Sequence, residues 1–428
     1  MKMDVKSMSQ GLRIEIPAYV QKVMTYLETA GFEAFVVGGC VRDSIMGIKP
    51  CDWDVCTVAK PEQIKDVFDG VMHVILTGEK HGTVTVVSDE NNIEITTYRT
   101  DGKYLDSRHP ESVSFVSSIE EDLSRRDFTV NAMAYNQTKG LIDVFAGRDD
   151  IFNKYIKCVG DARTRFEEDA LRIMRALRFS STLSFDIEDK TSDAIFKCRE
   201  LLNNVSAERI YTELSKLIMS DKPSCVLKKY KVVFEKIIPE VILSSNNVDK
   251  YFEMIDILPC RLSLRLAALF GILSSQESFK ILKRLKTDKV TRSCVCNILE
   301  NSEMTIDTDD ISVKYMLKKY GVSLSRDLLE FINAKNHVFN IQDNSCDKAI
   351  SIINRVLEDE ECFSVKDLNI CGTDLISIGI KNGPEVGEML DKILDNVIEG
   401  NIENKRDILI GFVNKERFAN KERFADKV

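Results

Sequence analysis

The chain has 428 residues, a length that fits two to four domains. It is 44% hydrophobic and 30% charged, as soluble globular proteins usually are. Its twelve cysteines are scattered without a CxxC pair, which excludes a disulfide scaffold and indicates reduced thiols in a cytoplasmic protein. No apolar stretch is long enough to span a membrane. The formal net charge of −9, read as a total, speaks against a nucleic-acid partner.

The charge is distributed unevenly along the chain. Residues 1–154 carry a net charge of −7, residues 155–292 carry +6, and residues 293–428 carry −8. The densest basic stretch, residues 261–292, has eight basic and two acidic side chains. The acidic total therefore hides a basic middle segment. An RNA partner is compatible with these charges if it contacts a limited basic strip.

The predicted elements change character about a third of the way along the chain. A helical spacing over residues 17–30 is followed by short β-rich runs, separated by glycine and asparagine turns. The runs cover residues 34–37, 71–76, 83–88 and 93–98. After about residue 155 the pattern is almost entirely helical. Strands followed by a helical array predict an α+β fold.

The first β-rich run leads into the sharpest local pattern, VVGGCVRD at residues 36–43. Two glycines after a strand, here Gly38 and Gly39, let the backbone approach an anion closely. A helix that begins after this turn would favour phosphate at its first N–H groups. Arg42, one turn into that helix, could add a bidentate phosphate contact. The pattern therefore predicts a phosphate-binding turn.

Nine residues after Asp43, Asp52 and Asp54 form an Asp-x-Asp pattern. In a strand both carboxylates share one face, with Cα atoms roughly 6.6 Å apart. Two carboxylates at that spacing can hold two Mg²⁺ ions for phosphoryl or nucleotidyl transfer. Glu94, in a neighbouring predicted strand, is the best candidate for a third carboxylate. A glycine pair or an Asp-x-Asp pattern alone is usually structural, but the two together at this spacing favour a site.

A second pattern, RRDFTVNAMA at residues 125–134, opens with two arginines and continues as a helix-compatible apolar run. Cations are disfavoured at a helix N-terminus, so arginines there would indicate a bound anion. A turn-rich link follows, marked by Asp143, Gly147 and Asp150.

A third pattern lies at residues 166–179, which have helical periodicity. On one helix Asp169 and Arg172 are i,i+3 neighbours, and Arg175 and Arg178 continue the stripe. A salt-bridged, solvated face is the simpler interpretation. However, a carboxylate accepts from an exocyclic amino group while a guanidinium donates to a ring nitrogen. Such a pair could select cytosine and adenine without a nucleic-acid template.

In this order, GGCVRD with DWD, RRDFTVNAMA, the D-x3-G-x2-D link, EDALRIMRALRF and SAERI resemble the motifs of the class II tRNA nucleotidyltransferases. These are the CCA-adding enzymes of the bacterial and eukaryotic type, in the poly(A) polymerase and polymerase β superfamily. The likeness covers residues 20–220 strongly and residues 369–404 weakly. It implies a polymerase β-like head with a mixed sheet, followed by all-α neck, body and tail domains. The corresponding ranges are 1–154, 155–220, 221–300 and 301–428.

The resemblance also implies a role for each matching residue. Asp52 and Asp54 would hold Mg²⁺, the implied cofactor, and with Glu94 they make our predicted catalytic set. Asp169 and Arg172 would read the base edge, and the D-x3-G-x2-D link would be a springy head–neck connection. The nucleotide-binding residues would be Gly38, Gly39, Arg42, Arg126, Asp127, Asn131, Asp169, Arg172, Arg175 and Arg178. Ala207 and Trp53 depart from the usual pattern, but neither replaces a polar ligand.

The implied activity is CCA addition or repair at the tRNA 3′ end, by in-line transfer from CTP and ATP with release of pyrophosphate. The implied partners are tRNA, CTP and ATP, with no membrane and no stable protein partner. Residues 101–114 read as a mobile loop that the resemblance assigns to addition of the terminal A, which argues against a CC-only enzyme. Two alternatives stay open: a poly(A) polymerase of the same superfamily, or a catalytically inactive RNA-binding protein.

Overall fold

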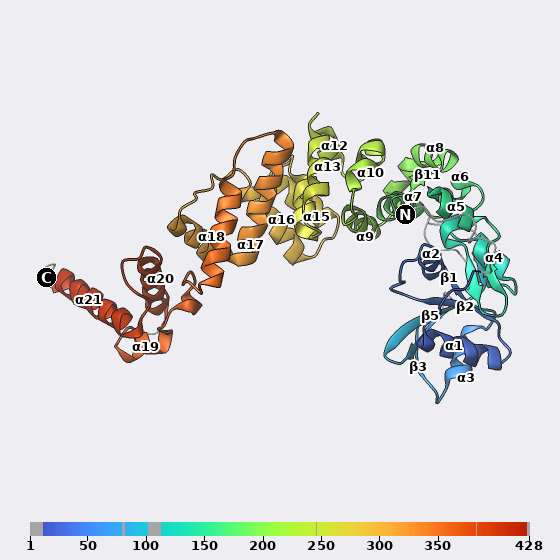
Figure 1. Cartoon of the computed structure of the whole chain (residues 1–428), viewed down its shortest axis with the longest axis horizontal. Helices are drawn as coiled ribbons and strands as arrows, with labels where there is room; N and C mark the ends of the chain where they lie inside the picture. The colour runs from blue at the N-terminus through green and yellow to red at the C-terminus, as the bar shows by residue number, and fades with distance from the viewer. Residues whose placement is uncertain (1–11, 79–81, 102–112, 245, 382, 426–428) are drawn as a thin grey trace. The chain divides into compact units, whose positions relative to one another are not determined.

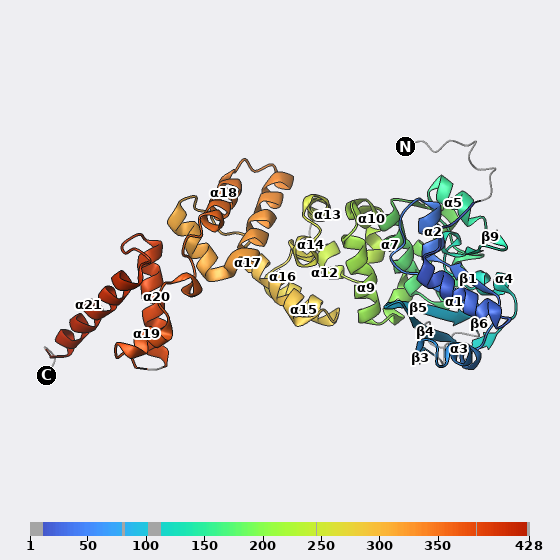
Figure 2. The same ribbon diagram turned by 60° about the horizontal axis from the view of Figure 1, so that its bottom comes forward.

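The structure is a computed structural model (Figure 1, Figure 2) that describes residues 12–78, 82–101, 113–244, 246–381 and 383–425. The chain divides into two compact units, Met1–Ser245 with Lys283–Thr287 and Asn246–Leu282 with Asp288–Val428. Most of the loop predicted at 101–114 lies outside the described residues. The predicted α+β fold is confirmed, with every described strand in the first unit. The four-domain division stays a prediction.

A mixed seven-stranded sheet forms the head of the first unit, in the order β3-β4-β5-β2-β1-β8-β9. Within it β2 and β5 run parallel, and the other neighbours run antiparallel. Two small pairs lie outside this sheet, antiparallel β6–β7 and parallel β10–β11. The strands are β1 (Ala34–Val37), β2 (Asp54–Thr57), β3 (His73–Gly78), β4 (Thr83–Ser88), β5 (Asn91–Thr97), β6 (Arg99–Asp101), β7 (Val113–Phe115), β8 (Ala134–Asn136), β9 (Gly140–Ile142), β10 (Tyr155–Ile156) and β11 (Asp186–Ile187).

The sheet is buried on both faces at its centre because side chains alternate along a strand. In β1, Ala34 and Val36 enter one apolar core while Phe35 and Val37 enter a second. Helices α1 and α3 pack together on the first of these cores (Figure 1). The head helices are α1 (Ala18–Thr29), α2 (Gly39–Ile45), α3 (Pro61–Phe68), α4 (Ile119–Ser124) and α5 (Gly147–Asn153), with a 3₁₀ turn η3 (Thr129–Asn131).

The helical part of the first unit follows the head. In it α7 packs on α9, α6 packs on α8, and the β10–β11 pair contacts α7. Sequence periodicity predicted one helix over residues 166–179, and this is wrong, because the segment is split between α6 and α7. The helices are α6 (Ala162–Glu168), α7 (Leu171–Leu183), α8 (Asp189–Cys198), η4 (Arg199–Asn204), α9 (Ala207–Ile218), α10 (Pro223–Lys229), α11 (Lys231–Phe234) and α12 (Pro239–Leu243).

The second unit contains helices and no strand among its described residues. One apolar cluster lies around α17 and α18, and another lies around α19 to α21. None of the described helices is both apolar enough and long enough to cross a membrane. The helices are α13 (Val248–Ile257), α14 (Leu262–Phe270), α15 (Ser275–Arg284), α16 (Lys289–Asn301), α17 (Asp310–Phe339), α18 (Ser345–Glu358), η5 (Val365–Asp367), α19 (Gly372–Ser377), α20 (Pro384–Ile398) and α21 (Arg406–Ala425). α15 ends inside the short segment that belongs to the first unit.

Candidate active site

The predicted glycine turn joins β1 to α2. Gly38 has φ 84° and ψ −129°, a conformation that L side chains rarely adopt, and its N–H donates to the Met133 carbonyl at 3.1 Å. A Cβ at Gly38 would lie 3.3 Å from Nη1 of Arg126. Glycine therefore leaves room for that guanidinium beside the turn, and α2 begins at Gly39 as predicted.

Arg42 extends from α2 into a buried polar contact. Its side chain donates to Asp43 Oδ1 at 2.8 Å from Nε and to Asn131 Oδ1 at 2.6 Å from Nη1. Asn131 therefore fixes the guanidinium from the far side of the turn. Two of the predicted nucleotide-binding residues, Arg42 and Asn131, are thus in direct contact although 89 residues separate them.

The Asp-x-Asp pattern lies at the start of β2. Asp54 is the first residue of the strand, and Asp52 precedes it, so the expectation that both belong to one strand is wrong. Trp53 between them is 6% exposed and packs in the head core, which anchors the segment that carries both aspartates. The bulky Trp53 side chain, which departs from the family pattern, is thus accommodated in the core.

Glu94 lies where the sequence predicted a third carboxylate. The parallel pairing of β2 with β5 sets Asp54 directly opposite Glu94. Burial, the charge of Glu94 and, more weakly, Asp52 raise the pKa of Asp54 to about 6, although Arg126 opposes the rise. Crowded carboxylates of this kind disfavour their own ionisation unless a cation joins them. Their surface remains exposed and accessible to a ligand.

The two arginines of RRDFTVNAMA lie at the end of a helix and not at its start. Arg125 is the C-cap of α4, where a cation is electrostatically favoured, so the argument from an unfavourable helix N-terminus is wrong. The residues after them form η3 and then β8. Arg125 and Arg126 both donate to Asp122, at 2.8 and 3.1 Å.

Asp122 is a site residue that the sequence reading missed. Its carboxylate is fully buried, and although burial opposes it, Arg126 and Arg125 hold its pKa below the usual range. Arg126 is left with a buried Nε that has no hydrogen-bond partner among the described residues. The i,i+3 and i,i+4 spacing of Asp122 to the two arginines was the signal that could have identified it.

The pair predicted to read the base, Asp169 and Arg172, lies at the break between α6 and α7. Asp169 is the C-cap of α6 and has extended backbone. The prediction that it shares one helix face with Arg172 is therefore wrong. Its carboxylate accepts from the Leu171 N–H at 3.1 Å and from Arg209 Nη2 at 2.7 Å. Arg172, 7% exposed, donates to Glu168 at 2.7 Å and to the Arg125 carbonyl at 3.0 Å.

Carboxylates also hold the other two arginines of α7. Arg175 approaches a single oxygen of Asp127, Oδ2, at 2.7 Å from Nε and 2.6 Å from Nη2. Arg178 donates to Glu213 of α9. Burial raises the pKa of Asp127, but Arg175, Arg172 and the Phe128 N–H together lower it further, so the net shift is downward. Sequence reasoning missed Glu213 and Arg209, although both lie in or just after the SAERI motif.

The D-x3-G-x2-D link is a compact hydrogen-bonded turn. Asp143 accepts from the Gly147 and Arg148 N–H groups, at 2.7 and 2.9 Å, and Asp150 accepts from the Thr129 hydroxyl at 2.6 Å. A Cβ at Gly147 would lie 2.2 Å from the Thr129 carbonyl oxygen, so only glycine fits there. Whether the link is springy stays a prediction.

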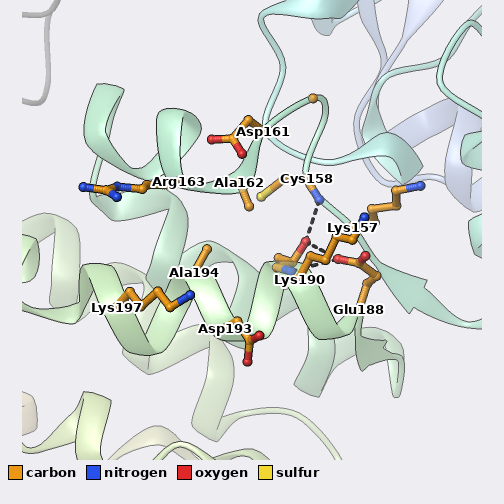
Figure 3. A pocket seen from close by; sticks show the side chains of 12 residues that line it. Lys157, Cys158, Asp161, Ala162, Arg163, Glu188, Lys190, Asp193, Ala194 and Lys197 are labelled. Carbon is orange, nitrogen blue, oxygen red and sulfur yellow. Dashed lines mark hydrogen bonds between the residues drawn. The ribbon is translucent and has the colours of Figure 1, made fainter.

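A pocket of about 490 Å³ lies away from these residues, between α6 and α8 (Figure 3). Asp161 and Glu188 at its rim cap these helices by accepting from the Thr164 and Thr191 N–H groups, each at 2.8 Å. None of the predicted site residues lines it. The predicted residues instead lie at the β1–α2 turn and in α2, at the start of β2, in β5, between α4 and the end of η3, and from the α6–α7 break into α7.

A mixed sheet that carries paired carboxylates beside a glycine turn, with arginines from a following helix, defines a nucleotidyltransferase head. Residues 34–157 match the poly(A) polymerase head domain, residues 184–241 match the RNA and SrmB-binding site of polymerase A, and residues 264–413 match tRNA nucleotidyltransferase domain 2. Relatives that match over nearly their whole length show which family of nucleotidyltransferases this chain resembles.

The CCA-adding enzyme of Streptococcus gordonii is 32% identical over 417 residues, which cover 95% of this chain and 100% of the relative. That of Lactobacillus delbrueckii subsp. bulgaricus is 36% identical over 424 residues, covering 93% and 98%. The crystal structure of the Bacillus stearothermophilus CCA-adding enzyme in complex with CTP matches with TM-score 0.73 and 28% identity, over 95% of this chain and 98% of that one. The chain belongs to the CCA-adding enzyme family, and the predicted family is confirmed.

Proposed function

We propose that this chain adds or repairs the 3′-terminal CCA of tRNA, with CTP and ATP as substrates and no nucleic-acid template. The observation that carries the proposal is the register of β2 on β5, which gathers Asp54 and Glu94 beside Asp52. Full-length likeness to CCA-adding enzymes favours this product over a poly(A) tract. The carboxylates argue against an inactive RNA-binding protein.

Asp52 and Asp54 would hold Mg²⁺, with Glu94 beside them. Carboxylate oxygens are the ligands that Mg²⁺ prefers, and the raised pKa of Asp54 reflects charge that a cation would relieve. Mg²⁺ commonly takes only one or two protein carboxylates together with substrate phosphates. This coordination fits the present chain, because its described residues contain no preformed cluster of three metal ligands. When bound, the ion would activate the RNA 3′-hydroxyl and stabilise the leaving pyrophosphate.

The triphosphate would lie against the glycine turn, Gly38 and Gly39, and the arginines beside it. Arg42 is held by Asn131, and Arg126 is held by Asp122, so both guanidinium groups are positioned before substrate arrives. Nη1 of Arg126 lies beside the Gly38 turn, where a phosphate oxygen could accept a hydrogen bond from it. The arginines would stabilise charge as the α-phosphate is attacked.

The base would be read by Asp169 and Arg172. Arg209 and the Leu171 N–H fix the carboxylate, yet each carboxylate oxygen can accept a second hydrogen bond, from an exocyclic amino group. Uracil and guanine present a carbonyl at that position, which a carboxylate repels. Arg175, with Asp127 as its partner, and Arg178 would steady the nucleotide. The residues that select the base are thus separate from those that bind phosphate.

We further propose that the chain works in the cytoplasm, because all twelve cysteines are free thiols, as expected in a reducing compartment. The enzymatic proposal is tested with the Asp52→Ala variant. We expect that variant to lose nucleotide incorporation while it retains binding of a tRNA that lacks CCA, measured by filter binding. Incorporation at the unchanged rate would contradict the metal assignment.

A further inference from the structure

Three guanidinium groups of the site converge on one aromatic ring. Phe179, near the middle of α7, has Arg178 at 3.8 Å from its ring centroid, Arg42 at 5.3 Å and Arg175 at 5.4 Å. These distances are within the range of cation–π attraction. The ring is only 7% exposed, so little water competes with the arginines for it. Arg42 comes from the head, while the other two are on the same helix as the ring.

Three like charges around one point repel each other unless something offsets the repulsion. Each arginine has at least one polar anchor: Arg42 has Asn131 and Asp43, Arg175 has Asp127, and Arg178 has Glu213. Burial is the largest cause that lowers the pKa of Arg178 below its usual value, and the charge of Arg175 lowers it further, although Glu213 opposes both. Repulsion from Arg175 is thus one of the two causes that outweigh the Glu213 anchor.

An aromatic ring suits this position better than another carboxylate would. Its face attracts cations through the ring quadrupole but carries no net charge. A fourth acid would neutralise the arginines and repel an incoming triphosphate. A neutral ring holds the guanidinium groups together and leaves their charge available to a polyanion.

We propose that Phe179 is a positioning residue, whose ring holds Arg42, Arg175 and Arg178 together for the triphosphate. It raises the affinity for CTP and ATP equally and has no part in choosing the base, which belongs to Asp169 and Arg172. This inference rests on the proposed function, since it concerns the same nucleotide site. It predicts that the affinity for the nucleotide depends on the electron density of the Phe179 ring and not on the volume of that ring.

Phe179 is also a core residue, because its ring packs edge-on against Phe128 at 5.8 Å. A truncation alone would not separate packing from cation attraction. Fluorination does, because each added fluorine weakens the negative face of the ring while the shape changes little. Phe166 is the matched control, since it is fully buried in α6 and no cation of the described residues lies over its ring.

The experiment replaces Phe179 with mono-, di- and trifluorophenylalanine in the full chain. Calorimetry then measures the dissociation constants of CTP, ATP and inorganic tripolyphosphate. We expect all three constants to rise stepwise with fluorine number, by about tenfold at three fluorines, which is about 1.4 kcal/mol. The melting temperature and the preference for CTP over UTP stay unchanged, and the same series at Phe166 is flat.

A flat series at Phe179 in a chain that adds nucleotides would overturn the inference and leave the proposed function intact. An equal slope at Phe166 would overturn it as well. If the chain binds neither CTP nor ATP but its affinity for tripolyphosphate falls with fluorine number at Phe179 as expected, the ring's role is supported and the proposed function is contradicted. An unsubstituted chain that binds none of the three probes would contradict both.

Discussion

Replacing Asp54 with asparagine should make the metal-free protein more stable while it destroys activity. Asp54 lies opposite Glu94 and near Asp52, and its pKa is raised from 3.8 to about 6. At about 1.36 kcal/mol per pKa unit, this corresponds to about 3 kcal/mol for a fully buried group. Burial is the largest cause of the rise, yet the residue keeps exposed surface, so water screens the repulsion and we expect about 1 kcal/mol.

The sign of this effect follows from proton linkage. The folded state binds the Asp54 proton more tightly than the unfolded state does, so the ionised carboxylate destabilises the fold above pH about 6. Asparagine removes that cost. The variant should therefore exceed the parent by about 1 kcal/mol at pH 7.5, and the difference should shrink below pH 6 and vanish near pH 4.

The assay is thermal unfolding in EDTA, where about 1 kcal/mol corresponds to a rise of roughly 2–4 °C for a unit of this size. Asp66→Asn on α3, at an exposed position away from the site, is the control and should change stability by less than about 0.5 kcal/mol. Added Mg²⁺ should stabilise the parent and not Asp54→Asn. An Asp54→Asn variant no more stable than the Asp66→Asn control at pH 7.5 would refute the reasoning.

Three further outcomes are expected. Arg172→Ala should lower the kcat/KM preference for CTP over UTP about 10- to 100-fold, the value of one charged hydrogen bond, and unchanged discrimination would count against base reading. Gly147→Ala should destabilise the first unit by about 3 kcal/mol in urea unfolding, because the new Cβ meets the Thr129 carbonyl. Gly387→Ala, inside α20 with open space around it, should instead stabilise by up to about 1 kcal/mol. Mg²⁺ should change the emission of Trp53, the one tryptophan of the chain, in the parent but not in Asp52→Ala, and a response in both would place the ion elsewhere.

The sequence predicted those parts of the site that depend on local order along the chain. The strand, glycine turn and helix around Gly38 depend on neighbours in sequence, and they form as expected. Glu94 was predicted only as a member of a nearby strand. Its register opposite Asp54 depends on the parallel pairing of β2 with β5, which no local pattern encodes.

The predictions failed where a helix ends without an obvious breaker. The segment around Asp169 has good helix formers on both sides, so periodicity ran straight through it. The break is stabilised by tertiary contacts, namely the pairing of Asp169 with Arg209 of α9. Arg125 likewise stands at the C-terminal end of α4, where it pairs with Asp122. The acidic residues in the first turn of α4 were the local signal that a helix begins before the arginines and not at them.

The most direct test of the account is the product itself. A tRNA that lacks its 3′-terminal CCA is incubated with the full chain, Mg²⁺, CTP and ATP, and the 3′ ends are sequenced. We expect a discrete CCA end, no product with UTP or GTP in place of CTP, and none from Asp52→Ala. A long A tract, or no added nucleotide, would contradict the assignment.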